Sequence, residues 1–448
     1  MQNVYIKTYG CQMNVYDSER MEELLQFNGY QTTDNIEKSD IIILNTCNIR
    51  EKAAEKIYSE LGRIKIYKNS RKEQNLETIV AVAGCVAQAE GDEIKKRAPV
   101  VDIVIGPESY HHLPDMISDI KRKTAKKFSS KLHFTPDEKF DSLPKNRQAK
   151  GFSSFVTIQE GCDKFCTFCV VPYTRGKEYS RPTSDIIDEI KNLTQQGIIE
   201  VSLLGQNVDA YHGKHNDNEI TLAQLIQEVS KIPEIKRIRY TTSHPNNFTQ
   251  DIIEQHGSNP KLMPYLHLPI QSGSNQILQA MNRKHTREKY LEIIQNIRKF
   301  RQDIAISSDF IVAFPGETDQ DFEDTLDLIK QVQFAQSYSF KYSPRPGTPA
   351  SLKDLIPDDI ASHRLQVLQD LLKNQQNTFN QKFLGATTPV LFESKGIRSK
   401  NQIVGKSPYL QTVIVNISEN QIPQDFFGKI LNVEITSVLE NTLAGKVV

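Results

Sequence analysis

The stretch Cys162-Asp163-Lys164-Phe165-Cys166-Thr167-Phe168-Cys169 carries the most specific chemical signal in this chain. Its three cysteines have the spacing C-x-x-x-C-x-x-C and come shortly after an apolar run at residues 155–158. Thiolates this close together are typical ligands of iron–sulfur clusters or of zinc. A structural zinc site needs four ligands, and no fourth Cys or His lies close in the sequence. The triplet therefore predicts a cubane cluster with one iron open to a small ligand; part of a zinc site, or buried thiols without a ligand role, are the alternatives.

Length and composition indicate an ordinary globular protein with several domains. The 448 residues suffice for two or three domains of roughly 100–200 residues each. No apolar run reaches about 18 residues, and the first residues lack the pattern of a signal peptide, so we expect a cytoplasmic protein without membrane contact. Six cysteines then favour metal or redox chemistry over disulfides. The formal net charge is zero, so any contact with nucleic acid must come from local patches.

Residues 1–117 predict a small α/β domain with a doubly wound parallel sheet. Apolar strand patterns at 4–6, 41–44, 78–83 and 101–105 alternate with helical patterns at 17–27 and 49–66 and with a helix that ends before Pro99. Strands that alternate with helices in this way form parallel sheets.

Cys11, Cys47 and Cys85 each follow one of these predicted strands. The carboxyl ends of parallel strands share one edge of the sheet, so we expect the three thiols to converge there as a second three-thiolate cluster site. Three independent core cysteines are the alternative. Their small or polar neighbours would leave room for a cluster: Gly10, Asn45 and Gly84.

Two further segments follow. Residues 118–150 predict a basic linker, either a solvated connector or a strip that contacts phosphates. Residues 151–381 alternate strand and helix patterns and predict a partial (β/α) barrel with its chemistry at the carboxyl ends of the strands. The strand candidates are 155–158, 201–204, 237–241, 265–270, 305–313 and 337–342, and the helical ones include 185–196 and 286–300.

Polar loops follow these barrel strands and describe a rim around one pocket. They include Gln206, His244, the pair Gln271-Ser272, and Phe314-Pro315-Gly316-Glu317. Each loop alone is a weak signal, and His244 could equally be an ordinary hydrogen-bonded histidine.

Five motifs give the chain a specific resemblance. On these motifs it resembles the radical S-adenosylmethionine (SAM) methylthiotransferases over almost its whole length, and most of all those that act on N6-dimethylallyladenosine in tRNA. One small departure is Ala313, where this family often has glycine. The motifs are Tyr9-Gly10-Cys11-Gln12-Met13-Asn14, Asn45-Thr46-Cys47-Asn48-Ile49-Arg50-Glu51, Pro172-Tyr173-Thr174-Arg175-Gly176-Lys177-Glu178, His267-Leu268-Pro269-Ile270-Gln271-Ser272-Gly273-Ser274 and Tyr342-Ser343-Pro344-Arg345-Pro346-Gly347-Thr348-Pro349.

The resemblance implies two 4Fe-4S clusters and two molecules of SAM per turnover. The cluster on Cys162, Cys166 and Cys169 would bind and cleave SAM, and the other would supply sulfur. It also implies a set of SAM contacts: Phe168, Gln206, Gln271, Ser272 and Asp309.

Residues 382–448 predict a compact OB-like β barrel. Short strand patterns at 390–393, 412–415 and 430–435 are separated by turn residues. The segment resembles the TRAM domain, an RNA-binding module, and the resemblance implies contacts from Arg398, Lys400 and Lys406.

The resemblance implies methylthiolation of N6-dimethylallyladenosine at position 37 of tRNA, a sulfur-group transfer. Expected partners are the tRNA anticodon stem-loop, an electron donor of flavodoxin or ferredoxin type and a sulfur carrier, and we expect a monomer. Two kinds of alternative stay open. One is a methylthiotransferase for threonylcarbamoyl-adenosine in tRNA or for a ribosomal-protein aspartate. The other is a non-enzymatic iron–sulfur protein that binds RNA or acts as a sensor.

Overall fold

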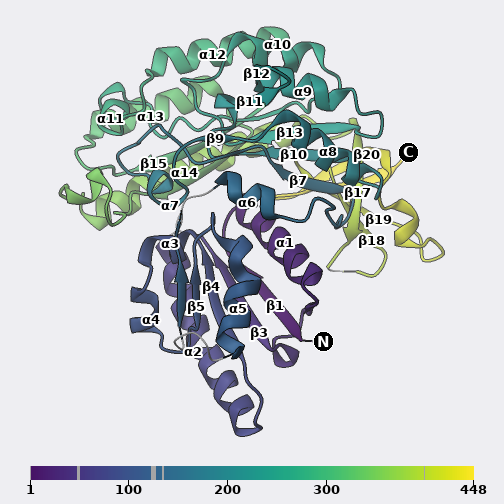
Figure 1. Cartoon of the computed structure of the whole chain (residues 1–448). Helices are drawn as coiled ribbons and strands as arrows, with labels where there is room; N and C mark the ends of the chain where they lie inside the picture. Colours follow the sequence, from purple (N-terminus) through teal and green to yellow (C-terminus); the bar gives the residue numbers. More distant parts are fainter. Residues whose placement is uncertain (1, 48–50, 123–127, 134–135, 398) are drawn as a thin grey trace. The chain divides into compact units, whose positions relative to one another are not determined.

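The computed structural model describes the chain except residues 1, 48–50, 123–127, 134–135 and 398, and it describes only the backbone of residues 51–54. The chain divides into two compact units (Figure 1). The first unit comprises Met1–Gln148, Gln159–Phe165 and Cys169–Arg181, and the second comprises Ala149–Ile158, Cys166–Phe168 and Pro182–Val448.

The first unit is built on a sheet of six parallel strands in the order β2-β1-β3-β4-β5-β6. Strands β3 and β4 are buried along their whole length, as expected for strands that are covered on both faces. The strands are β1 Asn3–Thr8, β2 Gln31–Thr32, β3 Ile41–Thr46, β4 Ile79–Gly84, β5 Ile103–Ile105 and β6 Ser129–Lys131.

Helices cover both faces of this sheet, which confirms the predicted doubly wound arrangement. Ile41 and Ile43 pack with helices α1 (Gln12–Phe27) and α5 (Leu113–Arg122) on one face. Ile42 and Leu44 point the opposite way, because side chains alternate along a strand, and pack with the helices of the other face. Those helices are α2 Glu51–Glu73, α3 Cys85–Glu90 and α4 Glu93–Arg97.

The segment predicted as a basic linker contributes ordered elements to the first unit. Strand β6 pairs with β5, and helix α6 (Pro136–Ser142) carries Lys139, whose side chain is completely buried. Part of the basic run, residues 123–127, lies outside the described residues. The boundaries at residues 117 and 150 stay predictions, as does a phosphate-contacting role for this segment.

The second unit begins with six parallel strands in two sheets, β13-β10-β7 and β14-β15-β16. A parallel bridge between Ile238 and Leu262 joins the two sheets, and the series forms the predicted partial barrel. The strands are β7 Ser153–Thr157, β10 Glu200–Leu204, β13 Arg237–Thr241, β14 Tyr265–His267, β15 Ala305–Val312 and β16 Gln336–Lys341.

Helices pack on one side of these strands and leave polar residues on the other. Val201, Leu203 and Phe310 belong to one large core with the helices, whereas Ser202 and Asp309 alternate with them and face the opposite side. The helices are α8 Thr183–Thr194, α9 Leu222–Ser230, α10 Gln250–Ser258, α11 Asn275–Ala280, α12 Arg287–Phe300 and α13 Asp319–Val332.

Helix α14 (Asp358–Gln381) leads into a closed five-stranded barrel in the order β17-β18-β19-β21-β20, which confirms the predicted small β barrel. Arg237 of β13 donates hydrogen bonds to the carbonyl oxygens of Pro389 and Lys406, so strand β13 is tied to this barrel through its backbone. The barrel strands are β17 Thr387–Lys395, β18 Gln402–Lys406, β19 Thr412–Asn416, β20 Ile430–Val438 and β21 Leu443–Val447.

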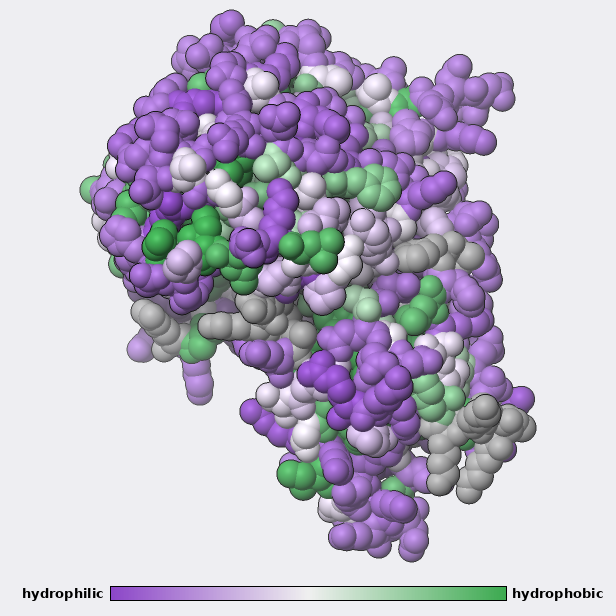
Figure 2. All heavy atoms as spheres, turned by 90° about the vertical axis from the view of Figure 1, so that its left-hand side faces the viewer, coloured by the Kyte–Doolittle hydropathy of each residue, from purple (hydrophilic) through white to green (hydrophobic). Residues whose placement is uncertain are grey.

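Within the described residues, no helix is both long enough and apolar enough to cross a membrane. The face drawn in Figure 2 is mostly hydrophilic, and its hydrophobic side chains gather in a few small patches.

Candidate functional site

Cys11, Cys47 and Cys85 lie at the carboxyl ends of β1, β3 and β4, which are neighbours in the sheet. Cys11 precedes the first residue of α1, and Cys85 is the first residue of α3. Strands β1 and β3 flank the point where the strand order reverses, and ligands bind at such switch points in doubly wound sheets. The structure thus brings the three predicted thiols to one edge, and within the described residues none of them forms a disulfide.

Two glycines allow the backbone segments at this edge to approach each other closely. A Cβ atom on Gly10 would lie 2.1 Å from Cβ of Cys47, and one on Gly84 would lie 2.4 Å from the carbonyl oxygen of Thr46. Both glycines also have positive φ, +124° and +89°, a region that other residues rarely adopt. A side chain at either position would therefore displace the loop that carries Cys47.

A hydrogen-bond network of two asparagines fixes the loops around Cys11. Asn14 accepts a hydrogen bond from Sγ of Cys11 at 3.3 Å and donates to the carbonyl oxygen of Thr46 at 3.0 Å. Asn45 donates to the carbonyl oxygen of Asn14 at 2.8 Å and to Oγ of Ser18 at 2.9 Å. The predicted role of Asn45 was to leave room, and the structure shows that it also cross-links β3 to α1.

The environment of the thiols differs from one cysteine to the next. A hydrogen bond from the Cys47 side chain lowers the pKa of Cys11 to about 6, against the effect of burial, and the charge of Arg175 contributes. Burial raises the pKa of Cys85, and Arg175 opposes that rise. This edge of the sheet fits a three-thiolate iron–sulfur site. It has soft sulfur donors, loops whose close approach only glycine permits, and a nearby cation.

Arg175 belongs to a buried charge network beside these cysteines. Its guanidinium donates to Oδ2 of Asp17 at 2.6 Å and lies 3.5 Å from Oε1 of Glu160. The same Glu160 oxygen lies 2.5 Å from Nζ of Lys139, which is 3.6 Å from Asp17 and 3.8 Å from Glu108. All five side chains are buried.

The pKa shifts in this network follow from burial and pairing. Burial and the neighbouring Glu160 raise the pKa of Glu108 well above its ordinary value of 4.5. For Glu160, burial is outweighed by Lys139 and Arg175, and the pKa falls to about 2. The network joins two basic side chains, Arg175 and Lys139, to three acidic ones: Asp17, Glu108 and Glu160. Sequence analysis missed it, because Arg175 and Asp17 are 158 residues apart and no local pattern links them.

The triplet Cys162, Cys166 and Cys169 follows β7 along the chain. In the first unit, the backbone N–H of Cys162 donates to the carbonyl oxygen of Gly176, and Sγ of Cys169 accepts from the backbone N–H of Val171 at 3.5 Å. In the second unit, Cys166 is buried and its Sγ accepts from Arg283 at 3.5 Å. The sulfur atoms of Cys166 and Cys169 are thus hydrogen-bond acceptors, which suits thiolate ligands.

The residue before the third cysteine, Phe168, is anchored in the second unit. Its ring packs on the small core that contains Met281 and Phe314. The preceding Thr167 accepts a backbone hydrogen bond from Ala350 and donates its own to Met281. This part of the triplet is therefore held by main-chain contacts from two distant segments.

Among the predicted SAM contacts, the structure places Gln271 beside Asp309. Gln271 and Asp309 are adjacent, since the backbone N–H of Gln271 donates to the carbonyl oxygen of Asp309 at 3.0 Å. Asp309 lies 3.6 Å from Nε2 of His267, on the polar side of β15. Ser272 is buried, and its Oγ lies 3.4 Å from Oγ1 of Thr325. Gln206 lies in the loop after β10.

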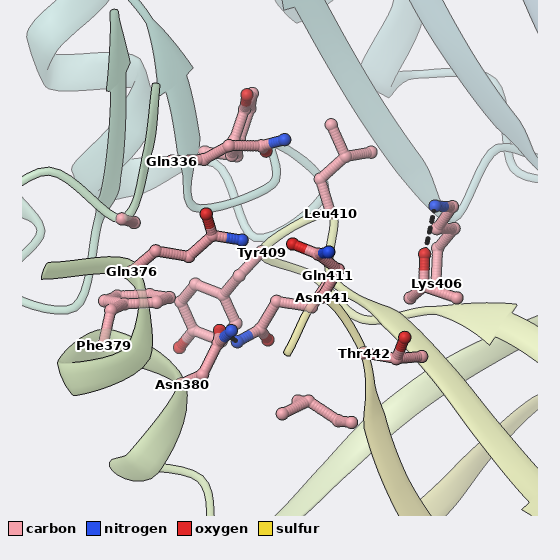
Figure 3. Close-up of a pocket in the computed structure, with 14 residues that line it drawn as sticks. Gln336, Gln376, Phe379, Asn380, Lys406, Tyr409, Leu410, Gln411, Asn441 and Thr442 are labelled. Atoms are coloured by element: carbon pink, nitrogen blue, oxygen red, sulfur yellow. Dashed lines mark hydrogen bonds between the residues drawn. The ribbon is translucent and has the colours of Figure 1, made fainter. Parts of the chain in front are cut away.

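The predicted RNA contacts also differ in their surroundings. Lys400 is exposed in the turn between β17 and β18, and Arg398 lies outside the described residues. Lys406 lines a cavity of about 110 Å³, and its Nζ donates to Oγ1 of Thr412 (Figure 3). Burial lowers the pKa of Lys406. Figure 3 shows that the same cavity is lined by Gln376 and Phe379 of α14.

Comparison with known proteins covers nearly the whole chain. Residues 3–106 match the uncharacterized protein family UPF0004, residues 156–329 the radical SAM superfamily and residues 381–448 the TRAM domain. The chain is 55% identical over 447 residues to a tRNA-2-methylthio-N(6)-dimethylallyladenosine synthase of Rickettsia bellii, with 99% of each chain covered. It is also 55% identical over 448 residues to a protein of the same name from Rickettsia felis, again with 99% of both chains covered.

Solved structures with a similar fold are far more distant in sequence. The radical SAM methyltransferase TsrM from Kitasatospora setae, solved with cobalamin and a [4Fe-4S] cluster bound, superposes with a TM-score of 0.57 at 11% identity, covering 78% of this chain and 77% of that one. The cobalamin-dependent radical SAM enzyme OxsB gives a TM-score of 0.55 at 12% identity, covering 84% of this chain and 56% of that one. At such identity the likeness concerns the fold alone.

Proposed function

The chain belongs to the family of tRNA-2-methylthio-N(6)-dimethylallyladenosine synthases, and we propose that it attaches a methylthio group to carbon 2 of N6-dimethylallyladenosine at position 37 of tRNA. The identity of 55% over 99% of the chain carries this proposal. The arrangement of the cysteines supports it, because the described residues present three thiols at one sheet edge and a second triplet after β7.

Two cysteine sets would hold two 4Fe-4S clusters in this proposal. Cys162, Cys166 and Cys169 would hold one, and Cys11, Cys47 and Cys85 the other. When bound, these clusters and SAM supply the radical, the sulfur and the methyl group that replacement of an aromatic hydrogen requires. A radical is needed because acid–base chemistry does not break such a C–H bond near neutral pH.

The chain's own residues position and shield these groups. Gly10 and Gly84 let the cysteine loops of the first unit approach each other, and Arg175 places positive charge beside Cys11 and Cys85. In the second unit, Arg283 donates to the sulfur of Cys166 and thereby orients that side chain. Hydrogen-bond donors to a metal ligand orient that ligand and tune its affinity for the metal.

The substrate RNA is proposed to bind as a single-stranded loop with splayed bases, which is how proteins read RNA sequence. We propose Lys400 as a phosphate contact of the TRAM domain, with Gln271 and Asp309 as contacts of SAM. The electron donor of flavodoxin or ferredoxin type, the sulfur carrier, the cytoplasmic location and the monomeric state belong to the same proposal.

Cysteine variants test the division between the two sets. The assay is anaerobic and contains dithionite, SAM and tRNA with N6-dimethylallyladenosine; 5′-deoxyadenosine and digested nucleosides are separated by chromatography. Replacing Cys162, Cys166 and Cys169 with Ala is expected to abolish both 5′-deoxyadenosine and the methylthio product. Replacing Cys11, Cys47 and Cys85 with Ala is expected to leave SAM cleavage measurable and abolish the methylthio product.

The same assay distinguishes the alternatives. Full product from the Cys11, Cys47 and Cys85 variant would contradict a sulfur-supplying role for that set. Modification of tRNA with threonylcarbamoyl-adenosine, or of a ribosomal-protein aspartate, in place of dimethylallyl tRNA would assign another substrate. A wild-type protein that carries iron but cleaves no SAM would indicate a sensor or RNA-binding protein instead.

A further inference from the structure

Two histidines and a glutamate of the first unit form a group that the proposed reaction does not use. His111 and His112 lie in a short 3₁₀ helix, Tyr110–His112, just before α5, and Glu138 lies in α6. Nε2 of His111 is 3.6 Å from Oε1 of Glu138, and Nε2 of His112 is 3.8 Å from the same oxygen. One ligand atom of each residue lies within 4.8 Å of the other two.

His111 is buried without the hydrogen bonds that a buried imidazole needs. Its side chain is 3% exposed, and neither ring nitrogen has a hydrogen-bond partner among the described residues. The 3.6 Å approach to Glu138 is longer than a hydrogen bond. A buried polar group without a partner destabilises the fold, so this position requires an explanation.

A bound cation would supply that explanation. Zinc bonds to His nitrogen and carboxylate oxygen are about 2.0–2.2 Å long, so tetrahedral ligand atoms are roughly 3.3 Å apart. The two His–Glu separations of 3.6 and 3.8 Å need to shorten by only a few tenths of an ångström, and the third separation, between the two imidazoles, is within 4.8 Å. Burial and the neighbouring His112 also lower the pKa of His111 to about 4, so its ring is neutral near pH 7.

We propose that His111, His112 and Glu138 bind a divalent first-row metal ion of borderline softness, with Zn²⁺ as the best fit. Two imidazoles and one carboxylate are a donor set for zinc, and the absence of thiolates from this group separates it from the cysteine sites. Glu138 is more than half exposed, so water can complete the coordination from that side.

The ion would fasten α6 to the sheet domain. His111 and His112 precede α5, whereas Glu138 precedes Lys139, the residue that places its ammonium in the buried charge network. Coordination across these two segments would hold α6 against the 3₁₀ helix, and a ligand that binds only the folded state stabilises it.

Zinc binding to full-length protein loaded anaerobically with iron and sulfide tests the proposal, because the six thiols are then occupied. Zinc per chain is measured by mass spectrometry after dialysis against micromolar Zn²⁺, at matched iron content. The variants are Glu138→Gln and His112→Gln, which leave buried His111 in place. Asp137→Asn is the matched control, since Asp137 is an exposed carboxylate of the same helix.

We expect one zinc per chain in the wild type and in Asp137→Asn, and at least tenfold weaker binding in Glu138→Gln and His112→Gln. An anomalous diffraction peak at the zinc edge between the three side chains would support the same assignment. The absence of zinc from the wild type would overturn the proposal, as would equal zinc affinity in the wild type and in Glu138→Gln. Activity with tRNA is not the readout, so the proposed function can fail or hold independently.

Discussion

Ala313 shows how a single residue can carry a conformation that its side chain disfavours. The chain has alanine here, where the family that it resembles often has glycine. In the structure Ala313 has φ of +56°, in the left-handed region, and its backbone N–H donates to Oε2 of Glu317 at 2.7 Å. The preference for glycine thus has a backbone cause, and the alanine is tolerated because the surrounding hydrogen bond holds the turn.

Replacing Ala313 with Gly is expected to raise the free energy of unfolding of the second unit by about 1 kcal/mol, because the left-handed conformation costs alanine about that much. Chemical unfolding followed by circular dichroism provides the measurement. Ala361→Gly in α14 serves as the control and is expected to change stability in the opposite direction, by about 1 kcal/mol. A lower stability for Ala313→Gly would show that the turn is not strained.

Buried His256 makes the stability of the fold depend on pH, in a direction that can be predicted. It is buried in α10 and its Nε2 lies 2.7 Å from the Tyr240 hydroxyl. Burial, with a contribution from Arg301, lowers its pKa from 6.5 to about 3. A histidine with a lowered pKa in the folded state stabilises the fold fully above pH 6.5, and this stabilisation is lost as the pH falls towards 3.

The wild type should therefore lose about 1.4 kcal/mol per pH unit below pH 6.5 relative to His256→Gln, which cannot titrate. Hydrogen exchange of α10 peptides is compared between the two proteins at equal pH, from 7.5 to 5.5. The difference isolates the contribution of His256 from the contributions of the other titrating groups. Equal pH slopes in the two proteins would mean that His256 is protonated without cost.

At the scale of elements, long apolar or periodic segments were predictable and short polar ones were not. Strand β13 was predicted with its observed bounds. Strands β3 and β4 were predicted nearly so, because continuous apolar runs mark buried strands. Strands β2 and β6 read Gln-Thr and Ser-Ser-Lys, which show no strand pattern, and they exist through pairing with β1 and β5. Tertiary pairing, not local preference, forms such edge strands.

Local sequence also failed to predict the surroundings of a charged residue on helix α6. Lys139 was part of a segment predicted as a solvated or phosphate-contacting linker, yet its ammonium lies among the carboxylates of Asp17, Glu108 and Glu160. Burial alone would lower the pKa of Lys139, but these carboxylates outweigh it and raise the pKa. The helix is therefore anchored by a charge whose partners come from three separate segments.

Replacing Lys139 with Met is expected to destabilise the first unit by about 3–5 kcal/mol, because it leaves the Glu160 carboxylate buried without its closest cation. Thermal and denaturant unfolding by circular dichroism measure the change. Lys145→Met is the matched control, since Lys145 is exposed, and it should stay within about 0.5 kcal/mol of the wild type. A Lys139→Met protein as stable as the control would contradict the anchoring role.

At the scale of the whole molecule, the sequence predicts which residues do chemistry but not which distant segments meet. The six cysteines were predicted as cluster ligands from their spacing and from their place after predicted strands, and their role as ligands stays a prediction. The contacts of Arg239 with the carbonyl oxygens of Ser407 and Pro408 could not, since they join positions 168 and 169 residues apart. Arg237 and Arg239 are buried, so removal of residues 382–448 would leave both guanidinium groups without these carbonyl partners. A truncated protein would then lose stability as well as any RNA contact.

A substitution therefore tests tRNA recognition more cleanly than a truncation does. Because the net charge of the chain is zero, binding must depend on a few local cations, and each phosphate contact contributes about one unit to the salt slope of the affinity. Lys400→Gln removes an exposed cation of the TRAM domain without touching Arg237 or Arg239. We expect its tRNA affinity to fall roughly threefold to tenfold at moderate salt, and the slope of log affinity against log salt to fall by about one.

Fluorescence titration of tRNA at several salt concentrations measures both quantities. Lys289→Gln on α12 is the matched control, since Lys289 is also exposed, pairs with Glu292 at 3.0 Å and lies outside the TRAM domain. The control should bind as the wild type does. If Lys400→Gln keeps the wild-type affinity and slope, the phosphate contacts lie elsewhere on the chain, and the basic residues at 118–150 become the next positions to neutralise, since that segment is the other predicted phosphate-contacting strip.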